Sequence, residues 1–387
     1  MAAYRTQNRT VLAKIESASG TDAVPTVGAN ALRVEVPSFT PALDSLTTNE
    51  VTGALDDSAP IPGGGGAGLS MPVVLKGSGA AGTAPEWGVL MEGCGLAETL
   101  RAADLTGTAQ AGAAGSITLA AAATGILVGE VIETTGGTGP GQRRVITAWD
   151  NGTKIALVTP NWTVTPDATT TYAVKANALY VPASVGLDTL TLHDYAHSSV
   201  SGQDSKRRTC IGAQGNAQFT LPARGLVRAQ FDFSGKFTAP TDVAHPGAAT
   251  YDAQKAIAFA GADIALGGAS TRFNSLTFDL GNQVQLDDDP RDAFGVDVAA
   301  IVKRQLSGRI NPPVALLSVR NVFADFLAST ASSLWVRYGT VDGNKLSFYF
   351  PEIRYQVPAD EDVTGNLHEG IPFVSEVTDG GVYICVH

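Results

Sequence analysis

Apolar and polar positions alternate most regularly in residues 273–306. One set of alternate positions in its first half is apolar: Leu276, Phe278, Leu280, Val284 and Leu286. The other set is polar: Ser275, Thr277, Asp279, Gln283 and Gln285. After an acidic turn, Val296, Val298, Ala300 and Val302 alternate with Asp297 and Lys303. Because successive side chains of a strand point to opposite faces, the pattern predicts a long β-hairpin with one packed face and one solvated face.

A second stretch, residues 31–76, has the same organisation. Leu32, Val34 and Val36 alternate with Arg33 and Glu35, and the phase shifts after Pro37, so that Phe39 and Leu43 oppose Thr40 and Asp44. The return strand carries Leu69, Met71, Val73 and Leu75 opposite Ser70 and Lys76. We expect a hairpin that is interrupted at Pro37, with the acidic, glycine-rich residues 53–66 as its loop.

Each hairpin precedes a stretch that favours a helix. Residues 85–99 begin with Pro85 and place Trp87, Leu90, Met91 and Cys94 on one helical face, and residues 313–329 form the second stretch. Residues 215–224 and 343–354 are also alike, since each has Gly-Asn before an alternating run that reaches a proline. These repeats predict two diverged copies of one β-rich module, and the alternative is two unrelated series of strands.

Residues 105–175 differ in character from both copies. They contain short β-prone runs at intervals set by turn residues, and the first module is incomplete before them. The predicted fold is therefore mainly β, with two tandem β-sandwich or barrel-like modules, each with a flanking helix, and an inserted small all-β domain. The expected boundaries are 1–30 for an N-terminal arm, 31–104 with 177–245 for the first module, 105–176 for the insert and 246–387 for the second module.

Composition and charge argue against several classes of function. The chain has 387 residues and a net charge of −11, which argues against nucleic-acid binding by phosphate neutralisation. No apolar run reaches the roughly 20 residues that span a bilayer, and the N-terminus lacks a signal-peptide core, so we expect synthesis in the cytoplasm and no membrane partner. Cys94, Cys210 and Cys385 are far apart in the sequence and are expected to be buried as free thiols.

No stretch predicts catalysis or a cofactor. The run Gly63–Gly66 lacks the Gly-Lys-Ser/Thr ending of a phosphate loop, and we expect it to be a plain loop. His193 and His197 have a spacing that could hold zinc on a helix, but no further ligand lies near them in the sequence. Lys206, Arg207 and Arg208 could contact a phosphate or an acidic loop of a neighbouring subunit. We therefore expect neither an enzyme nor a metal site.

Two longer stretches carry a family resemblance. Residues 201–216 running into 229–240, and residues 274–282 followed by 339–344 and 371–373, make the chain similar to the major tail tube protein of siphophages, whose tails are long and non-contractile. The resemblance covers roughly residues 30–100 and 177–387. The insert resembles a small module of phage virion proteins in its runs 137–144 and 162–167.

The resemblance implies a structural virion protein, made in the host bacterial cytoplasm. Its subunits would form rings whose hairpins join into a β-barrel, and stacked rings would form a tube through which DNA passes without sequence-specific binding. Two modules in one chain imply trimeric rings with pseudo-six-fold symmetry. The implied partners are further copies of the chain, the tape measure protein, the tail terminator and the distal tail proteins.

Strand alternation then assigns residues to the expected tube surfaces. The candidates for the lumen are Glu35, Asp44, Ser70, Ser275, Thr277, Asp279, Gln283, Gln285 and Asp297. The candidates for contacts between rings are the acidic residues of the two hairpin loops, Asp56, Asp57, Asp287, Asp288 and Asp289, which lack the spacing of a calcium-binding EF-hand. The alternative function is a β-rich phage decoration protein or a carbohydrate-binding or host-surface-binding protein, in which the insert would be the binding part.

Overall fold

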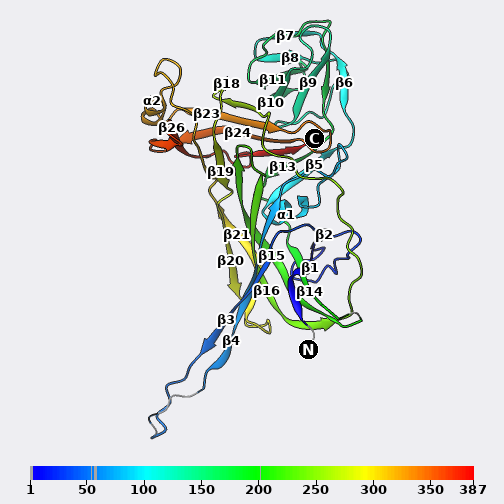
Figure 1. The fold of residues 1–387 in the computed structure, drawn as a ribbon, viewed down its shortest axis with the longest axis vertical. Helices are drawn as coiled ribbons and strands as arrows, with labels where there is room; N and C mark the ends of the chain where they lie inside the picture. Colours follow the sequence, from blue (N-terminus) through cyan, green and yellow to red (C-terminus); the bar gives the residue numbers. More distant parts are fainter. Residues whose placement is uncertain (1–2, 54, 56–58, 201) are drawn as a thin grey trace.

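The computed structural model describes residues 3–53, 55, 59–200 and 202–387. It confirms a mainly β protein, built from an 18-stranded sheet, a 7-stranded sheet and a two-stranded sheet. The described helices are both short: α1 spans Gly88–Gly93 and α2 spans Val322–Leu327. The molecule is elongated, with the 7-stranded sheet at one end and a projecting two-stranded arm at the other (Figure 1).

The large sheet takes strands from both halves of the chain. Those before residue 250 are β1 (Tyr4–Ile15), β2 (Ala31–Leu32), β3 (Ser38–Leu46), β4 (Ile61–Val74), β5 (Leu96–Arg101), β13 (Asn177–Pro182), β14 (Leu190–Ser198), β15 (Ser205–Pro222) and β16 (Arg228–Val243). The later ones are β17 (Asp263–Leu266), β18 (Ala269–Ser270), β19 (Ser275–Asp279), β22 (Ser307–Ile310), β23 (Ala331–Tyr338), β24 (Leu346–Tyr355), β25 (Ala359–Val363), β26 (Asn366–Val374) and β27 (Tyr383–Val386).

Eight of these strands form one antiparallel run in the order β3-β4-β16-β15-β19-β22-β26-β25. Directly paired residues share a face, so the register fixes what each face carries. One row across six strands is Val73, Ala229, Phe219, Phe278, Gly308 and Phe373. The next row is Pro72, Gln230, Gln218, Asp279, Ser307 and Val374. The run therefore has one apolar face and one mainly polar face.

The apolar face forms the main core. Phe219 stacks on Phe278 with ring centroids 4.3 Å apart, and both pack against Phe348 of β24. The α1 segment covers the same core, because Trp87, Leu90, Met91 and Cys94 are all buried in it, as their helical spacing predicted. Cys210 and Cys385 are also buried free thiols, which confirms the expectation for all three cysteines.

The long hairpin predicted at 273–306 is not continuous. Gly281 has a φ of +68°, and a Cβ there would lie 2.0 Å from the Gln305 carbonyl oxygen, so the chain bends out of the large sheet at this point. β20 (Asn282–Asp288) and β21 (Val296–Arg304) then pair only with each other among the described strands. Register shifts in this pair also break the predicted alternation of the return strand, leaving Val302 59% exposed.

The β20–β21 hairpin packs over the large sheet where the sheet has glycines. A Cβ on Gly66 would lie 2.5 Å from Leu286, and one on Gly212 would lie 2.6 Å from Val298. The backbone N–H of Ile301 donates to the Gln214 side chain at 2.8 Å. The hairpin is thus a second layer over part of the eight-stranded run.

Both helices are shorter than predicted. The helix expected at 85–99 ends at Gly93, and Gly95 with a φ of +76° leads the chain into β5. In the 313–329 stretch the helix begins only after Asn321, whose side chain accepts the Ala324 N–H at 3.0 Å, and residues before it form a loop. Asn321 therefore acts as a late N-cap, and only Val322 of α2 is buried.

Three other local predictions are wrong. Gly63–Gly66 lies in β4 and not in a turn, because a Cβ on Gly65 would lie 2.0 Å from the Ala42 carbonyl oxygen of the paired strand. Gly215 and Asn216 lie in the middle of β15, whereas Gly343 and Asn344 do form a turn before β24. The expected N-terminal arm contains β1, which pairs with β14 and buries Val11, so it is part of the core.

Residues 105–174 form the 7-stranded sheet, ordered β6-β12-β9-β10-β11-β8-β7. The strands are β6 (Leu105–Thr108), β7 (Ala111–Ala113), β8 (Ser116–Thr118), β9 (Val131–Gly136), β10 (Arg143–Asp150), β11 (Ile155–Thr159) and β12 (Thr171–Val174). This sheet has its own apolar cluster, which includes Ile117, Ile132, Ile146 and Trp162. It also touches the large sheet, because Val145 packs with Ala265, Trp335 and Tyr349 in a small separate cluster.

Candidate tube-wall surfaces

The solvent-facing side of the eight-stranded run is a network of polar side chains. Asp279 on β19 accepts hydrogen bonds from Asn216 at 2.7 Å and from Gln218 at 2.9 Å, both on β15. Ser70 on β4 donates to Asp232 on β16 at 2.6 Å and accepts from Gln230 at 2.7 Å. These hydrogen bonds link side chains on neighbouring strands, so the solvent-exposed surface is ordered.

Charges on this face are largely paired. Arg228 on β16 lies 3.1 Å from Glu35, and this hydrogen-bonded pairing raises the pKa of the guanidinium. Arg309 on β22 forms an ion pair with Glu361 on β25. The face is therefore of mixed charge, whereas the residues selected from the sequence alone gave an acidic balance. Exposed pairs of this kind contribute little stability, about 0–1 kcal/mol each, so they act mainly on the surface potential.

The candidate lumen residues fall on three parts of the molecule. Ser70, Ser275, Thr277 and Asp279 lie on the polar face, and Glu35 lies in the loop before β3, next to Arg228. Asp44 lies on the exposed part of β3. Gln283, Gln285 and Asp297 lie exposed on the separate β20–β21 hairpin. The structure thus brings four of the nine together on the polar face of the eight-stranded run.

Sequence analysis missed much of the polar face. Asn216, Gln218, Thr220, Arg228, Gln230, Asp232, Ser307 and Arg309 complete it. The signal was present, since Ala217, Phe219 and Leu221 alternate with polar residues just as Leu276 and Phe278 do. The pattern could not show that β15 pairs with β19, because the paired residues are more than 50 positions apart in the sequence.

The candidate contacts between rings are only partly described. Asp56 and Asp57 lie outside the described residues. Asp287 and Asp288 are exposed at the end of β20. Asp289 accepts hydrogen bonds from the Arg291 side chain, which lower the pKa of its carboxyl to about 2. Nearby, Lys236 of β16 pairs with Asp292 at 2.8 Å, which ties this hairpin loop to the sheet.

The eight-stranded run has two open edges. Among the described strands, β3 pairs only with β4, and β25 pairs only with β26. Eight of the nine residues of β3 are exposed, and β25 is partly exposed along its length. Open edges carry unpaired N–H and C=O groups, so a further strand can pair at each end of this sheet.

The histidines of β14 and Arg208 of β15 bond to other side chains of the same chain. His193 and His197 lie on β14, where His197 bonds Thr10 at 2.8 Å and Ser205 at 2.9 Å, and burial lowers the pKa of both imidazoles. Arg208 pairs with Asp194 of the same chain at 3.0 Å. Within the described part of the chain, no three His, Cys, Asp or Glu side chains are grouped so as to hold a metal ion.

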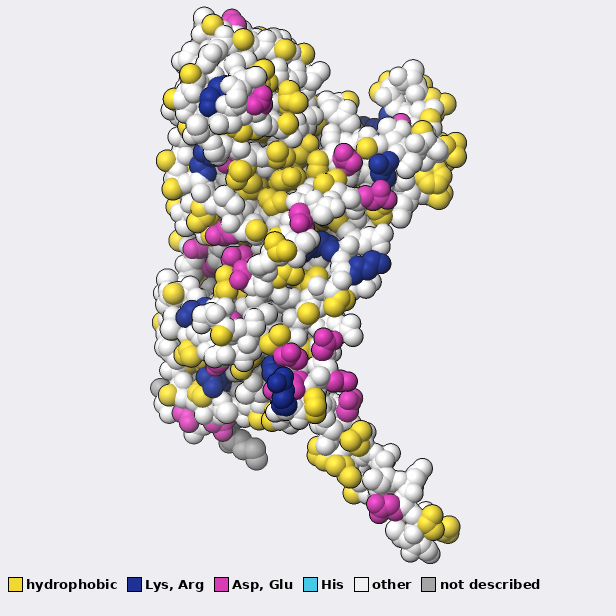
Figure 2. Space-filling model, turned by 180° about the vertical axis from the view of Figure 1, so that it is seen from behind, with side chains coloured by type: hydrophobic (Ala, Val, Ile, Leu, Met, Phe, Trp, Pro, Cys, Tyr) yellow, Lys and Arg dark blue, Asp and Glu magenta, His cyan; other side chains and the backbone are white. Residues whose placement is uncertain are grey.

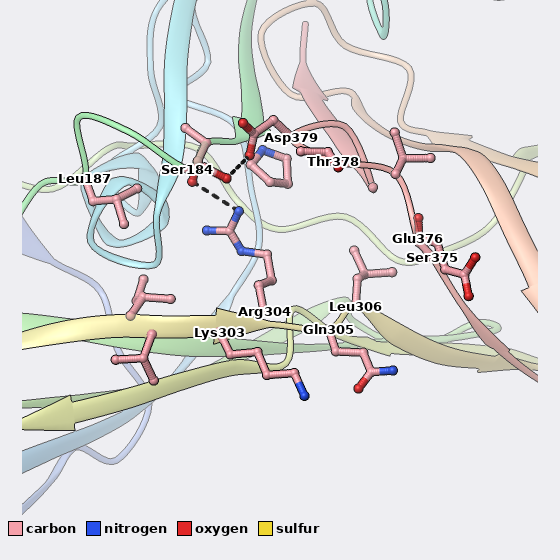
Figure 3. A pocket seen from close by; sticks show the side chains of 16 residues that line it. Ser184, Leu187, Lys303, Arg304, Gln305, Leu306, Ser375, Glu376, Thr378 and Asp379 are labelled. Atoms are coloured by element: carbon pink, nitrogen blue, oxygen red, sulfur yellow. Dashed lines mark hydrogen bonds between the residues drawn. The ribbon is translucent and has the colours of Figure 1, made fainter.

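A cavity of about 650 Å³ lies between β21, the loop at 182–187 and the loop at 375–381 (Figure 3). Arg304 enters it from β21 and donates to the carbonyl oxygens of Gly95 at 2.8 Å and Ala183 at 3.3 Å. Ser184 donates to Asp379 across its upper side at 2.5 Å. Arg304 therefore links β21 to the segments that contain Gly95 and Ala183.

None of the described helices is long and apolar enough to cross a membrane. A two-faced sheet with a packed side, an ordered polar side and two open edges is the construction of a wall subunit in a larger assembly. The chain matches the family described as phage tail tube protein over residues 6–374, and it belongs to that family. It is thus a structural protein of the phage tail tube. Comparison with curated proteins gives no match.

Proposed function

We propose that the polar face of the eight-stranded run lines the lumen of a siphophage tail tube. The observation that carries this proposal is the combination of a polar face with open edges at β3 and β25. Pairing of β3 of one subunit with β25 of the next would extend the sheet around a ring. The apolar face, covered by α1 and the other strands, would face outward into the body of each subunit.

Strand number supports a trimeric ring. The run takes four strands, β3, β4, β16 and β15, from the predicted first module, and four, β19, β22, β26 and β25, from the second. Three chains would then supply 24 strands in six similar groups, which is a barrel with pseudo-six-fold symmetry. The proposed boundaries of the two modules and the insert are those expected from the sequence, except that β1 joins the first module, and residues 105–176 lie on the outside of the tube.

The remaining roles follow from this arrangement. DNA passes through the lumen during delivery without sequence-specific binding, and the tape measure, tail terminator and distal tail proteins meet the tube in the lumen or at its ends. The end of the β3–β4 hairpin is the proposed contact to the adjacent ring, because its two strands leave the sheet and have no third strand beside them among the described residues. An isolated two-stranded hairpin is marginally stable in water, so it needs a partner.

Electron microscopy of tubes assembled from the purified chain tests the proposal. The expected result is stacked rings of three chains around a hole, with Gln218, Thr277 and Asp279 facing it. Rings of six chains would contradict the two-module account of the sheet. Compact particles without a hole, under conditions in which native tails remain intact, would favour the decoration or surface-binding role instead.

A further inference from the structure

We propose that the two open edges of the eight-stranded run select each other by charge, with Arg9 and Arg208 beside β3 of one copy binding carboxylates of β25 of the next copy. These carboxylates are those of Asp360 and Asp362. The inference rests on the proposed ring and names the contact that decides which edges pair. Unpaired N–H and C=O groups alone would not exclude the pairing of two identical edges.

Two guanidiniums lie beside the beginning of β3. Arg9 donates to the carbonyl oxygen of Pro37 at 2.5 Å. Arg208 lies 5.8 Å from the centre of the Phe39 ring, which packs against the main core and so marks the apolar side of the sheet. Both guanidiniums share the buried carboxylate of Asp194, at 2.9 Å and 3.0 Å. Among the described ion pairs, this cluster therefore has one positive charge in excess.

The carboxylates of β25 divide between the two sides of the sheet. Glu361 faces the polar side, where it forms the ion pair described above. Asp360 is paired across the strands with Glu369, so Asp360 and Asp362 face the apolar side. Both are exposed and make no ion pair among the described residues. β25 pairs with β26 in the lobe that carries α2, and Figure 2 shows several acidic side chains on that lobe.

The topology of the run determines how the two edges meet. All its neighbouring strands are antiparallel, so β25 of one copy and β3 of the next would also pair antiparallel. Pairing the five residues of β25 with residues 38–42 keeps the polar faces of the two copies continuous. It places Asp362 directly opposite Phe39, and therefore next to the guanidinium of Arg208.

Like charges oppose the two incorrect pairings. Two β25 edges would bring Asp360 and Asp362 of both copies close together, and two β3 edges would bring two positive clusters together. Pairing of β3 with β25 brings unlike charges together. The favoured contact is therefore heterologous, as a closed ring requires.

The acidic residues nearest to the cluster do not neutralise it. The loop that contains Asp292 lies on the other side of the sheet, since its partner Lys236 belongs to the polar face of β16. Asp44 is near the far end of β3, roughly 16 Å away along the strand. Asp242 lies directly opposite Lys206, which balances its charge. A carboxylate from another copy can therefore still bind the cluster.

Removal of the two carboxylates tests the contact. Asp360→Asn with Asp362→Asn keeps the side-chain size and an acceptor for the Gly365 N–H. We expect the concentration needed for assembly at low salt to rise roughly tenfold, and its salt dependence to weaken, because fewer charges remain to be screened. The matched control is Asp150→Asn with Asp167→Asn, exposed residues of the insert that also accept backbone N–H groups. Equal assembly and equal salt dependence of the two double variants, measured by sedimentation, would overturn the inference.

A cross-link distinguishes this inference from the proposed ring. Ala42→Cys of one copy lies opposite Ala359→Cys of the next in the proposed pairing, and the native cysteines are buried, so a short bis-maleimide should join the two variants. The control replaces Ala359→Cys by Ala97→Cys, which is exposed on β5. Cross-links above the control, with unchanged assembly of the Asp360→Asn, Asp362→Asn variant, would refute the charged contact and leave the ring intact. No cross-link above the control would overturn both the ring joint and the charged contact.

Discussion

At the scale of single residues, Gly308 on β22 is tightly packed within the eight-stranded run. A Cβ at this position would lie 2.4 Å from the Phe373 ring and 2.7 Å from the Thr277 carbonyl oxygen. Gly308 faces the apolar side, directly between Phe278 and Phe373 in the cross-strand row. The glycine therefore makes room for the aromatic side chains of its two neighbours.

Gly308→Ala is expected to lower the free energy of unfolding by about 1–3 kcal/mol, because an added methyl group must displace a packed ring or the backbone. Chemical denaturation of the chain under conditions that keep it monomeric measures this. Gly28→Ala is the control, since nothing lies within 4 Å of a Cβ there. Equal stability of the two variants would contradict the packing argument.

At the scale of elements, the insert joins the large sheet at two adjacent strand ends. Arg101 at the end of β5 pairs with Asn177 at the start of β13, so the ends left by removing the insert are already neighbours. Asp104 accepts the Ala176 N–H at 2.7 Å, which closes the same connection. The insert also covers Trp335 and Tyr349, so it is not a freely projecting domain.

Replacing residues 105–175 by a short Gly/Ser bridge between Asp104 and Ala176 should leave tube assembly intact. The deletion uncovers Trp335 and Tyr349, so we also expect lower solubility of the free chain. Electron microscopy and a solubility assay measure the two effects. A soluble deletion protein that forms neither rings nor tubes would show that the insert is part of the wall.

The elements also show how far the sequence could predict this structure. Alternation correctly placed the apolar and polar sides of β4 and β19, because that signal is local. It could not show that β20 and β21 leave the sheet at Gly281, since the reason is the nearby Gln305 carbonyl oxygen. The late start of α2 follows from the Asn321 cap, a signal that the sequence contains but that the proline pair before it obscured.

At the scale of the whole molecule, the proposed lumen is an ordered polar surface of mixed charge on a chain whose net charge is negative: two ion pairs lie on it, and Asp232 and Asp279 are bonded to neutral side chains. Asp279 accepts three hydrogen bonds, from Asn216, Gln218 and the Gly281 N–H, so its carboxylate organises the wall as well as charging it. Gln285 and Asp297 are exposed on β20 and β21 and are freer to change. Repulsion between such a wall and phosphate is screened over roughly 10 Å at 0.1 M salt, so it acts close to contact and keeps the duplex away from the wall.

Adding positive charge at these two positions should therefore slow DNA transfer. Gln285→Lys with Asp297→Asn makes each chain two units more positive and repeats the change in every ring, which favours phosphate contacts in a salt-dependent way. We expect normal tubes that release DNA more slowly at low salt and at nearly the normal rate at high salt, measured by dye-monitored ejection. Leu157→Lys with Val164→Lys adds the same charge to exposed sites of the insert and should have no effect if the insert lies outside the tube. If both pairs slow ejection equally, the slowing is not specific to the hairpin, and this argument for Gln285 and Asp297 in the lumen fails. Normal ejection by the first pair at low salt would show that β20 and β21 do not line the lumen.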